Sequence, residues 1–62
     1  MPEGFKDIKE ELPPLWEDVV LLTEDNRRII GYYNGNTSGK DEFRITNNDN
    51  LIPNVVAWMP TF

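Results

Sequence analysis

The chain contains neither cysteine nor histidine, which sharply limits how a protein of only 62 residues can be stabilised. A domain of about 60 residues buries only about 60% of the surface of its unfolded chain, so disulfides, metals or partner subunits often supply missing stability. Disulfides and ordinary zinc sites are excluded here. A compact aromatic core or self-association must replace them, and we expect a homo-oligomer. The expected core aromatics are Phe5, Trp16, Tyr32, Tyr33, Phe43 and Trp58.

The sequence carries no sign of a membrane segment or of export. No apolar run reaches the roughly 18 residues that a membrane-spanning helix needs. The opening Met-Pro-Glu-Gly-Phe lacks the basic and apolar parts of a signal peptide. We therefore expect a cytoplasmic protein without a membrane partner. Asn36-Thr37-Ser38 matches the glycosylation triplet, and without a secretory signal we interpret this match as chance.

The charged residues are unevenly distributed along the chain, whose net charge is −5. Residues 1–25 contain eight acidic residues and two lysines, whereas residues 26–46 contain four basic and two acidic residues. General nucleic-acid binding needs a basic surface that releases counterions, so we expect no nucleic-acid partner. The middle segment still offers a local cationic face.

Two neighbouring segments predict a β-hairpin. Val19–Thr23 is β-branched and apolar on both faces, as in a well-covered strand. Glu24–Asn26 is a turn signal, and Arg27–Tyr33 resumes β character close enough to pair with the first strand. Gly31 inside the second strand indicates a bulge or a close backbone approach.

Two further strands are expected in the second half of the chain. We expect a loop at Asn34–Lys40, because asparagine and glycine tolerate the positive φ of tight turns. Glu42–Thr46 alternates polar and apolar residues, which predicts a strand with Phe43 and Ile45 pointing inward. Asn54–Met59 is the expected final strand.

The N-terminal segment predicts an arm that packs across these strands. Phe5–Leu12 has apolar residues at spacings of three and four, typical of one helical turn, although an irregular or 3₁₀ segment fits equally well. Pro13-Pro14 ends this segment. The expected fold is mainly β: a single domain over residues 1–62, with a short N-terminal arm or helical turn (1–16) packed across a small four-stranded antiparallel meander (17–62).

Two short blocks stand near the ends of the chain. Phe5 and Leu12-Pro13 have the spacing of an opening W-x(6)-L-P block, and Trp58-Met59-Pro60 lies near the C-terminus. Val19–Leu22 and Gly31-Tyr32-Tyr33 stand between them. Together these blocks resemble a family of short phage and prophage proteins known only as a domain of unknown function. Its members open with a tryptophan-led Leu-Pro block and end in a Thr-His-Trp-Met-Pro-like block.

The chain departs from the family pattern at two positions. The opening tryptophan is Phe5 here, and Ala57 replaces the histidine usual before the closing tryptophan. Any chemistry of that histidine would be absent from this protein. The family carries no established reaction. The resemblance implies a virus-linked accessory gene, and such short genes often encode proteins that block host machinery or host defence in the bacterial cytosol.

The residues give little support for catalysis. Without His or Cys, Ser-His-Asp and Cys-His arrangements are impossible. Adjacent carboxylates on a strand point to opposite faces, and those of this chain stand beside turns, so we interpret them as solvated surface. We expect no enzyme activity, no cofactor and no metal. The carboxylate pairs are Glu10-Glu11, Glu17-Asp18, Glu24-Asp25 and Asp41-Glu42.

Two loops resemble ligand-binding motifs only in part. Gly35–Lys40 has three residues between its glycines, and Asp41 follows the lysine, so this segment is not a phosphate-binding P-loop. A hairpin loop is the simpler interpretation, although its backbone N–H groups would suit an anion. Asn47–Asn50 lacks the spaced acids and closing glutamate of a calcium loop.

Our first functional hypothesis is a counter-defence protein that sequesters an anionic, nucleotide-like signalling ligand at a subunit interface. An exposed tyrosine stacks a purine well, and an arginine binds its phosphate. The simpler alternative is that both tyrosines and Trp58 fill the core or a subunit contact. The predicted ligand-binding residues are Arg27, Arg28, Tyr32, Tyr33, Lys40 and Arg44.

The alternative hypothesis is a protein–protein inhibitor of a host enzyme that acts on nucleic acid or in defence. Here the acidic N-terminal third meets a basic surface on the host protein. The predicted contact residues of this alternative are Glu10, Glu11, Glu17 and Asp18.

Overall fold

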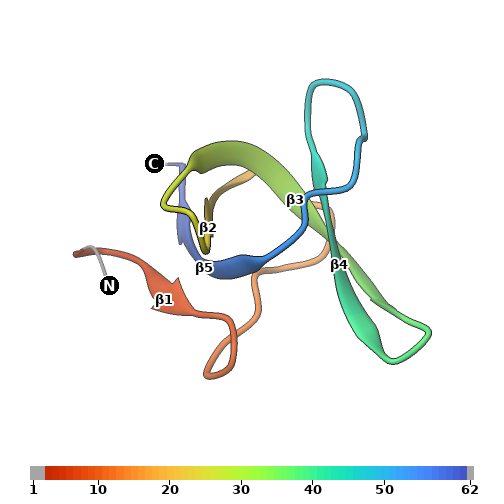
Figure 1. The fold of residues 1–62 in the computed structure, drawn as a ribbon, viewed down its shortest axis with the longest axis horizontal. Helices are drawn as coiled ribbons and strands as arrows, with labels where there is room; N and C mark the ends of the chain where they lie inside the picture. Colours follow the sequence, from red (N-terminus) through yellow and green to blue (C-terminus); the bar gives the residue numbers. More distant parts are fainter. Residues whose placement is uncertain (1–2, 62) are drawn as a thin grey trace.

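The computed structural model describes residues 3–61, whose strands form one open antiparallel sheet (Figure 1). The strands are β1 (Lys6–Asp7), β2 (Val19–Thr23), β3 (Arg28–Thr37), β4 (Lys40–Ile45) and β5 (Val55–Pro60). The predicted mainly β, antiparallel fold is confirmed. The ends of the predicted domain range, residues 1, 2 and 62, lie outside the described residues. Between residues 3 and 61, no helix has the length and apolar character needed to cross a bilayer.

The strand order, β1-β5-β2-β3-β4, differs from that of the predicted four-stranded meander. After β4 the chain first turns back on it, and the N–H of Ile52 donates to the carbonyl of Phe43 at 2.9 Å. The chain then leaves β4, because Pro53 has no N–H to continue the ladder and Asn54 has a φ of 59°. β5 consequently pairs with β2 instead, and β1 adds a fifth strand beside β5.

The N-terminal segment forms a very short strand and one turn rather than a helix. In β1, Lys6 lies opposite Trp58 of β5. The N–H groups of Glu10 and Glu11 both donate to the carbonyl of Asp7 at 3.0 Å. The apolar spacing of this segment therefore corresponds to this single turn, directly after the edge strand β1, and not to a longer helix.

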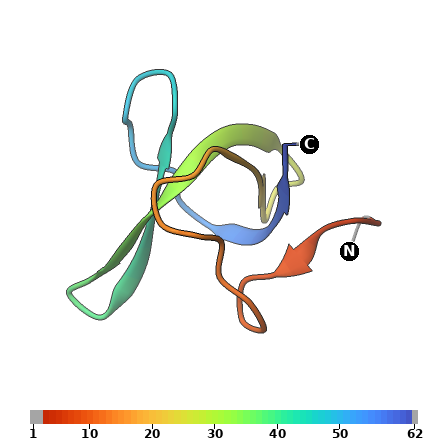
Figure 2. The ribbon, with the colours of Figure 1, turned by 180° about the vertical axis from the view of Figure 1, so that it is seen from behind.

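The segment after this turn crosses the core side of the sheet, as predicted for the N-terminal arm. The indole N–H of Trp58 donates to the carbonyl of Glu11 at 2.9 Å. Further along, the backbone N–H of Trp16 donates to the carbonyl of Tyr33 at 3.0 Å. Figure 2 shows the segment, in orange, passing in front of the strands. The arm thus reaches from β5 to β3, and Pro13 between these two contacts is buried.

β3 and β4 form a longer hairpin than the sequence predicts. The expected loop at Asn34–Lys40 is wrong, since strand pairing continues to Thr37 and Lys40. The connection is a two-residue turn, Ser38-Gly39, in which both residues have positive φ (54° and 80°). Such a turn matches the twist of a hairpin. Gly35 (φ 91°) lies inside β3, where the register shifts as in a bulge.

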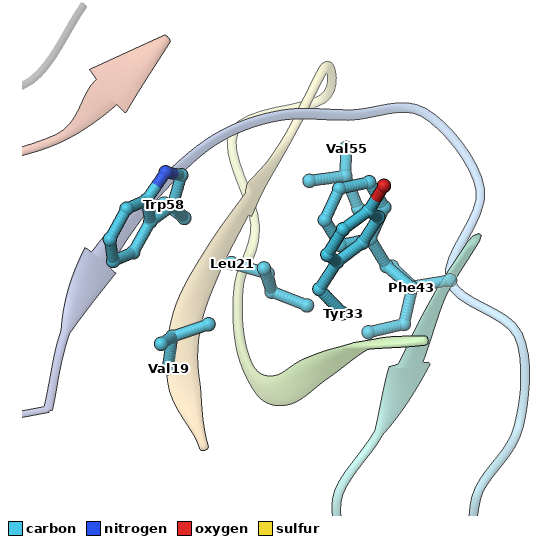
Figure 3. Close-up of a cluster of buried hydrophobic side chains, with 7 residues drawn as sticks. Val19, Leu21, Tyr33, Phe43, Val55 and Trp58 are labelled. Atoms are coloured by element: carbon cyan, nitrogen blue, oxygen red, sulfur yellow. The ribbon is translucent and has the colours of Figure 1, made fainter. Parts of the chain in front are cut away.

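The main core cluster lies on one side of the curved sheet (Figure 3). Val19 and Leu21 of β2 are fully buried at its centre. The rings of Tyr33 and Phe43 pack with their centroids 5.2 Å apart, and Ile45 packs against the same cluster, so the predicted inward face of β4 is confirmed. The buried cluster comprises Val19, Leu21, Tyr33, Phe43, Ile52, Val55 and Trp58.

Gly31 lies where side chains and backbone of the neighbouring strands leave no room for a side chain. A Cβ atom at this position would lie 2.4 Å from the carbonyl oxygen of Arg44 and 2.8 Å from Cδ1 of Leu21. The predicted close backbone approach at Gly31 is therefore confirmed. The bulge of β3 lies further along, between Tyr33 and Asn36.

Candidate functional site

The six residues of the predicted ligand site are spread from the β2–β3 turn, which holds Arg27, along the β3–β4 hairpin. Arg28 is paired with Leu22 at one end of β3, and Lys40 is paired with Thr37 at the other. Arg44 lies opposite Tyr32, near the middle. The sheet therefore brings Arg44 and Tyr32 together and leaves the other cations apart from them.

Three arginines of this predicted site have partners within the chain. Nε of Arg27 lies 3.1 Å from the carboxylate of Asp25, and Nε of Arg44 lies 2.6 Å from that of Glu42. The guanidinium of Arg28 lies over the ring of Phe5, 5.6 Å from its centroid. The two ion pairs lower the positive charge that an anionic ligand would meet at Arg27 and Arg44.

Arg27 also lines an open pocket of about 500 Å³ beside the β2–β3 turn. Ile29 and Ile52 contribute apolar surface to this pocket, and Glu24 and Asp25 contribute two acidic groups. A hydrogen bond from the Thr23 hydroxyl, and secondarily the charge of Arg27, lower the pKa of Asp25. The pocket is thus net acidic at neutral pH, which does not suit an anionic ligand.

The two adjacent tyrosines face opposite sides of the sheet, as predicted. Tyr33 is buried, and its hydroxyl donates a hydrogen bond to Asp41 at 2.7 Å. This hydrogen bond, together with burial, raises the pKa of Tyr33 to about 12. Tyr32 lies on the other side and donates to Asp49 at 2.8 Å, which raises its pKa. Tyr33 is a core residue, and only Tyr32 is placed to meet a ligand. The anion-sequestering hypothesis stays a prediction, because the structure does not bring its six predicted residues together in one place.

The acidic residues of the alternative hypothesis lie at the surface, as a contact site requires. Glu10 and Glu17 are exposed, and the carboxylate of Glu11 lies 3.5 Å from Lys6. Asp18 accepts a hydrogen bond from the hydroxyl of Thr46 at 2.9 Å. No group of three or more potential metal-ligating side chains occurs in the part of the chain that the structure describes.

Trp16 is the prominent surface residue that the sequence does not predict. Its expected place in the core is wrong, because 70% of its surface is exposed. Trp16 has a φ of 62°, which is unusual for a bulky residue, and its indole N–H donates to Oδ1 of Asn34 at 3.1 Å. The other non-glycine residues with positive φ among residues 3–61 are small or polar: Asn26, Ser38, Asp49 and Asn54.

Nothing in the strand pattern shows this role of Trp16. The residue stands outside the predicted strands, where alternation gives no direction to a side chain. Two acids, Glu17 and Asp18, follow it directly, and they are the one local signal of an exposed position. Its ring is directed outward by the hydrogen bonds to Tyr33 and Asn34 of β3, which are remote in sequence.

A hydrogen-bonded network on the outer side of β3 and β4 connects Trp16 with Tyr32. Nδ2 of Asn34 donates to Glu42 at 2.9 Å, and Glu42 also accepts from Nε of Arg44. Nη1 of Arg44 donates to the backbone carbonyl of Asp49 at 2.7 Å. The network consists of Trp16, Asn34, Glu42, Arg44, Asp49 and Tyr32.

Two exposed apolar side chains, those of Ile30 and Leu51, lie beside this network. Ile30 precedes Tyr32 by two residues on β3 and is 48% exposed. Leu51, which is 59% exposed, bridges to Arg44. Alternate residues of a strand and directly opposed residues share a face, so these side chains lie on one side of the sheet. We call this face the outer surface, formed by Trp16, Ile30, Tyr32, Arg44 and Leu51.

The chain matches no family model, no curated protein and no solved structure. The resemblance of its terminal blocks to phage proteins stays a prediction.

Proposed function

We propose that the chain is a non-enzymatic protein-binding domain that acts through the outer surface. The observation that carries this proposal is the exposed indole of Trp16. Asn34 accepts the hydrogen bond from the indole N–H, and the backbone of Trp16 itself has a left-handed conformation. A ring that is fixed before binding loses little conformational entropy on contact. Burying its apolar surface against a partner would then contribute strongly to affinity.

The composition of the outer surface supports the same function. Tryptophan, tyrosine and arginine are the residues that most often dominate the energy of protein contacts. Trp16, Tyr32 and Arg44 are joined by one hydrogen-bonded network, with Ile30 and Leu51 beside it. An aromatic and apolar surface with a partly exposed arginine resembles the centre of a protein interface more than a small-molecule cavity.

The charge of the chain favours a basic partner. Glu17 and Asp18 follow Trp16 directly, and residues 1–25 carry a surplus of six acidic groups. Complementary potentials speed association and exclude partners of the same charge. The proposal therefore develops the acidic-inhibitor hypothesis, in which the partner is a host protein with a basic surface. It moves the main contact from Glu10 and Glu11 to the neighbourhood of Trp16.

A peptide-display selection on the immobilised full chain tests this function. Peptides enriched on the wild type are then measured against Trp16→Ala and against Leu12→Ala. Leu12 is also exposed, but it follows Glu11, which contacts Trp58 on β5. We expect the Trp16 variant to lose at least about tenfold in affinity and the Leu12 variant to bind like the wild type.

Circular dichroism and urea unfolding of both variants establish that the sheet is intact. Equal affinity of the enriched peptides for the wild type and for Trp16→Ala would contradict the proposed site. An equal loss in both variants would also contradict it, since the effect would then not depend on Trp16.

A further inference from the structure

Resting on the proposed function, we propose that the partner contributes an arginine whose guanidinium stacks on the exposed face of Trp16, which is followed directly by the acidic residues Glu17 and Asp18. The occupant of the outer surface is thus an arginine-containing, basic segment of another protein. Three features carry this assignment: the presentation of the ring, a fixed carboxylate beside β3, and the use of the same contact elsewhere in the chain.

The face of the Trp16 indole, rather than its N–H edge, is the part of the ring that is available to a partner. The N–H of Trp16 is already engaged by Asn34, so it is not needed for a partner hydrogen bond. The face of an indole carries partial negative charge and attracts cations more strongly than other aromatic rings do. Between residues 3 and 61, the two cation–π contacts involve other rings, and the face of Trp16 has no described cation over it.

A carboxylate is held next to the same strand. The backbone N–H of Thr46 donates to the carbonyl of Ile30 at 3.1 Å, and the Thr46 hydroxyl donates to Asp18 at 2.9 Å. These bonds place the carboxylate of Asp18 beside β3, two residues after Trp16 in sequence. The negative charges of Asp18 and of the preceding Glu17 adjoin Trp16 in sequence and attract a basic side chain towards it.

The chain already uses this type of contact within its own fold. Nζ of Lys6 lies 5.0 Å from the centroid of Trp58, and the guanidinium of Arg28 lies 5.6 Å from that of Phe5. Lys6 is also within 3.5 Å of the carboxylate of Glu11, whose carbonyl binds the indole of Trp58. A cation that shares an aromatic ring and a carboxylate therefore exists at Trp58. We assign the cation–ring part of this arrangement, with a partner's arginine, to Trp16.

Charge distinguishes a basic partner from a second copy of this chain. Two copies joined through the outer surface would bring together two chains of net charge −5, with Glu17 and Asp18 of each chain next to Trp16 in sequence. Nucleic acid is disfavoured for the same reason. A basic segment of another protein meets no such repulsion.

The indole N–H resonances of the full ¹⁵N-labelled chain provide the test. The probe is the peptide acetyl-Arg-Ile-Arg-Leu-Arg-amide, and its matched control replaces each arginine with citrulline, which is isosteric but uncharged. Trp58 is buried and serves as an internal reference. We expect the arginine peptide to shift the Trp16 signal saturably, and the citrulline peptide to bind at least about fivefold more weakly.

Substitutions in the protein separate the contribution of the Trp16 ring to peptide affinity from that of the overall negative charge. We expect Trp16→Phe to bind more weakly than the wild type, because phenylalanine is a weaker cation–π partner and lacks the N–H that Asn34 holds, and Trp16→Leu to lose the most, about fivefold. The pair Glu17→Gln with Asp18→Asn should weaken binding several-fold. The matched pair Glu10→Gln with Glu11→Gln changes the net charge equally and should have a smaller effect.

Equal affinities for the arginine and citrulline peptides, equal affinities of Trp16→Leu and Trp16→Phe, or no saturable shift of Trp16 would each overturn the arginine assignment. The protein-binding function fails on a different result, namely when peptides selected without regard to charge bind Trp16→Ala as tightly as the wild type. Selected peptides that need Trp16 for binding but contain no arginine would refute only the arginine assignment and not the protein-binding function.

Discussion

At the residue scale, Asn34 organises the outer surface, because both functions of its amide are used. Oδ1 accepts the indole proton of Trp16, and Nδ2 donates to Glu42. The amide thereby ties an exposed ring outside the sheet to a side chain of β4. The orientation of Trp16 thus depends on a residue 18 positions further along the chain.

Replacing Asn34 should release the ring of Trp16. We expect Asn34→Ala to lose about 1 kcal/mol of the free energy of unfolding, the typical contribution of a side-chain hydrogen bond. The indole proton of Trp16 should also exchange faster with solvent, while that of Trp58, bound to Glu11, should be unaffected. Unchanged exchange in Asn34→Ala would show that Asn34 does not hold the ring.

The buried hydroxyl of Tyr33 should make stability depend on alkaline pH. Its hydrogen bond to Asp41, together with burial, raises the pKa of Tyr33 from about 10 in the unfolded chain to about 12 in the folded protein. The folded state therefore holds the proton more tightly. The stabilisation is complete below about pH 10 and is lost as the pH rises towards about 12.

Urea unfolding of the wild type and of Tyr33→Phe at several pH values checks this dependence. The difference in free energy of unfolding between the two proteins should be constant from neutral pH to about pH 10 and should then shrink. Tyr32 and Asp49 are present in both proteins, so their contribution cancels. A difference that stays constant up to about pH 12 would contradict the role given to Tyr33.

At the element scale, local pattern predicts the strands better than it predicts their neighbours. Alternation in β4 correctly places Phe43 and Ile45 inward, and the turn at Glu24–Asn26 correctly joins β2 to β3. The position of β5 beside β2 is not a local property. It depends on where Pro53 and Asn54 end the pairing with β4 and on a strand more than 30 residues earlier in the chain.

The candidate site shows the same division. The sequence correctly places the acidic residues Glu10 and Glu17 at the surface, because acids beside turns stay solvated. It does not give the side-chain partners of the arginines, although Glu42 and Arg44 are two apart on a strand and therefore share a face. The exposure of Trp16 depends on Tyr33 and Asn34, which no local pattern connects to it.

The turn between β3 and β4 should accept a stabilising substitution. Ser38 and Gly39 both have positive φ, and asparagine followed by glycine is the preferred pair in such turns. We expect Ser38→Asn to raise the free energy of unfolding by about 0.5 kcal/mol, since asparagine tolerates the left-handed region better than serine. Thermal unfolding measures the gain. Ser38→Val should be destabilising, and the opposite order of the two variants would contradict the turn geometry.

At the scale of the whole molecule, the sheet has two sides with different roles. One side faces the core, and the N-terminal arm lies against it at Trp58, whose indole donates to the carbonyl of Glu11. The other side carries the outer surface, in a chain whose acidic groups are concentrated before residue 26. The predicted homo-oligomer stays a prediction, and the negative charge of the chain opposes its formation through this surface.

The most direct test of the central claim is to map where a partner touches the domain. A peptide selected on the wild-type chain is added to the ¹⁵N-labelled protein, and the N–H signals that move are assigned to residues. We predict the largest shifts at the Trp16 indole and in the backbone around Ile30, Tyr32 and Leu51. Shifts confined to the pocket beside the β2–β3 turn, with the Trp16 signal unmoved, would contradict a binding function of the outer surface.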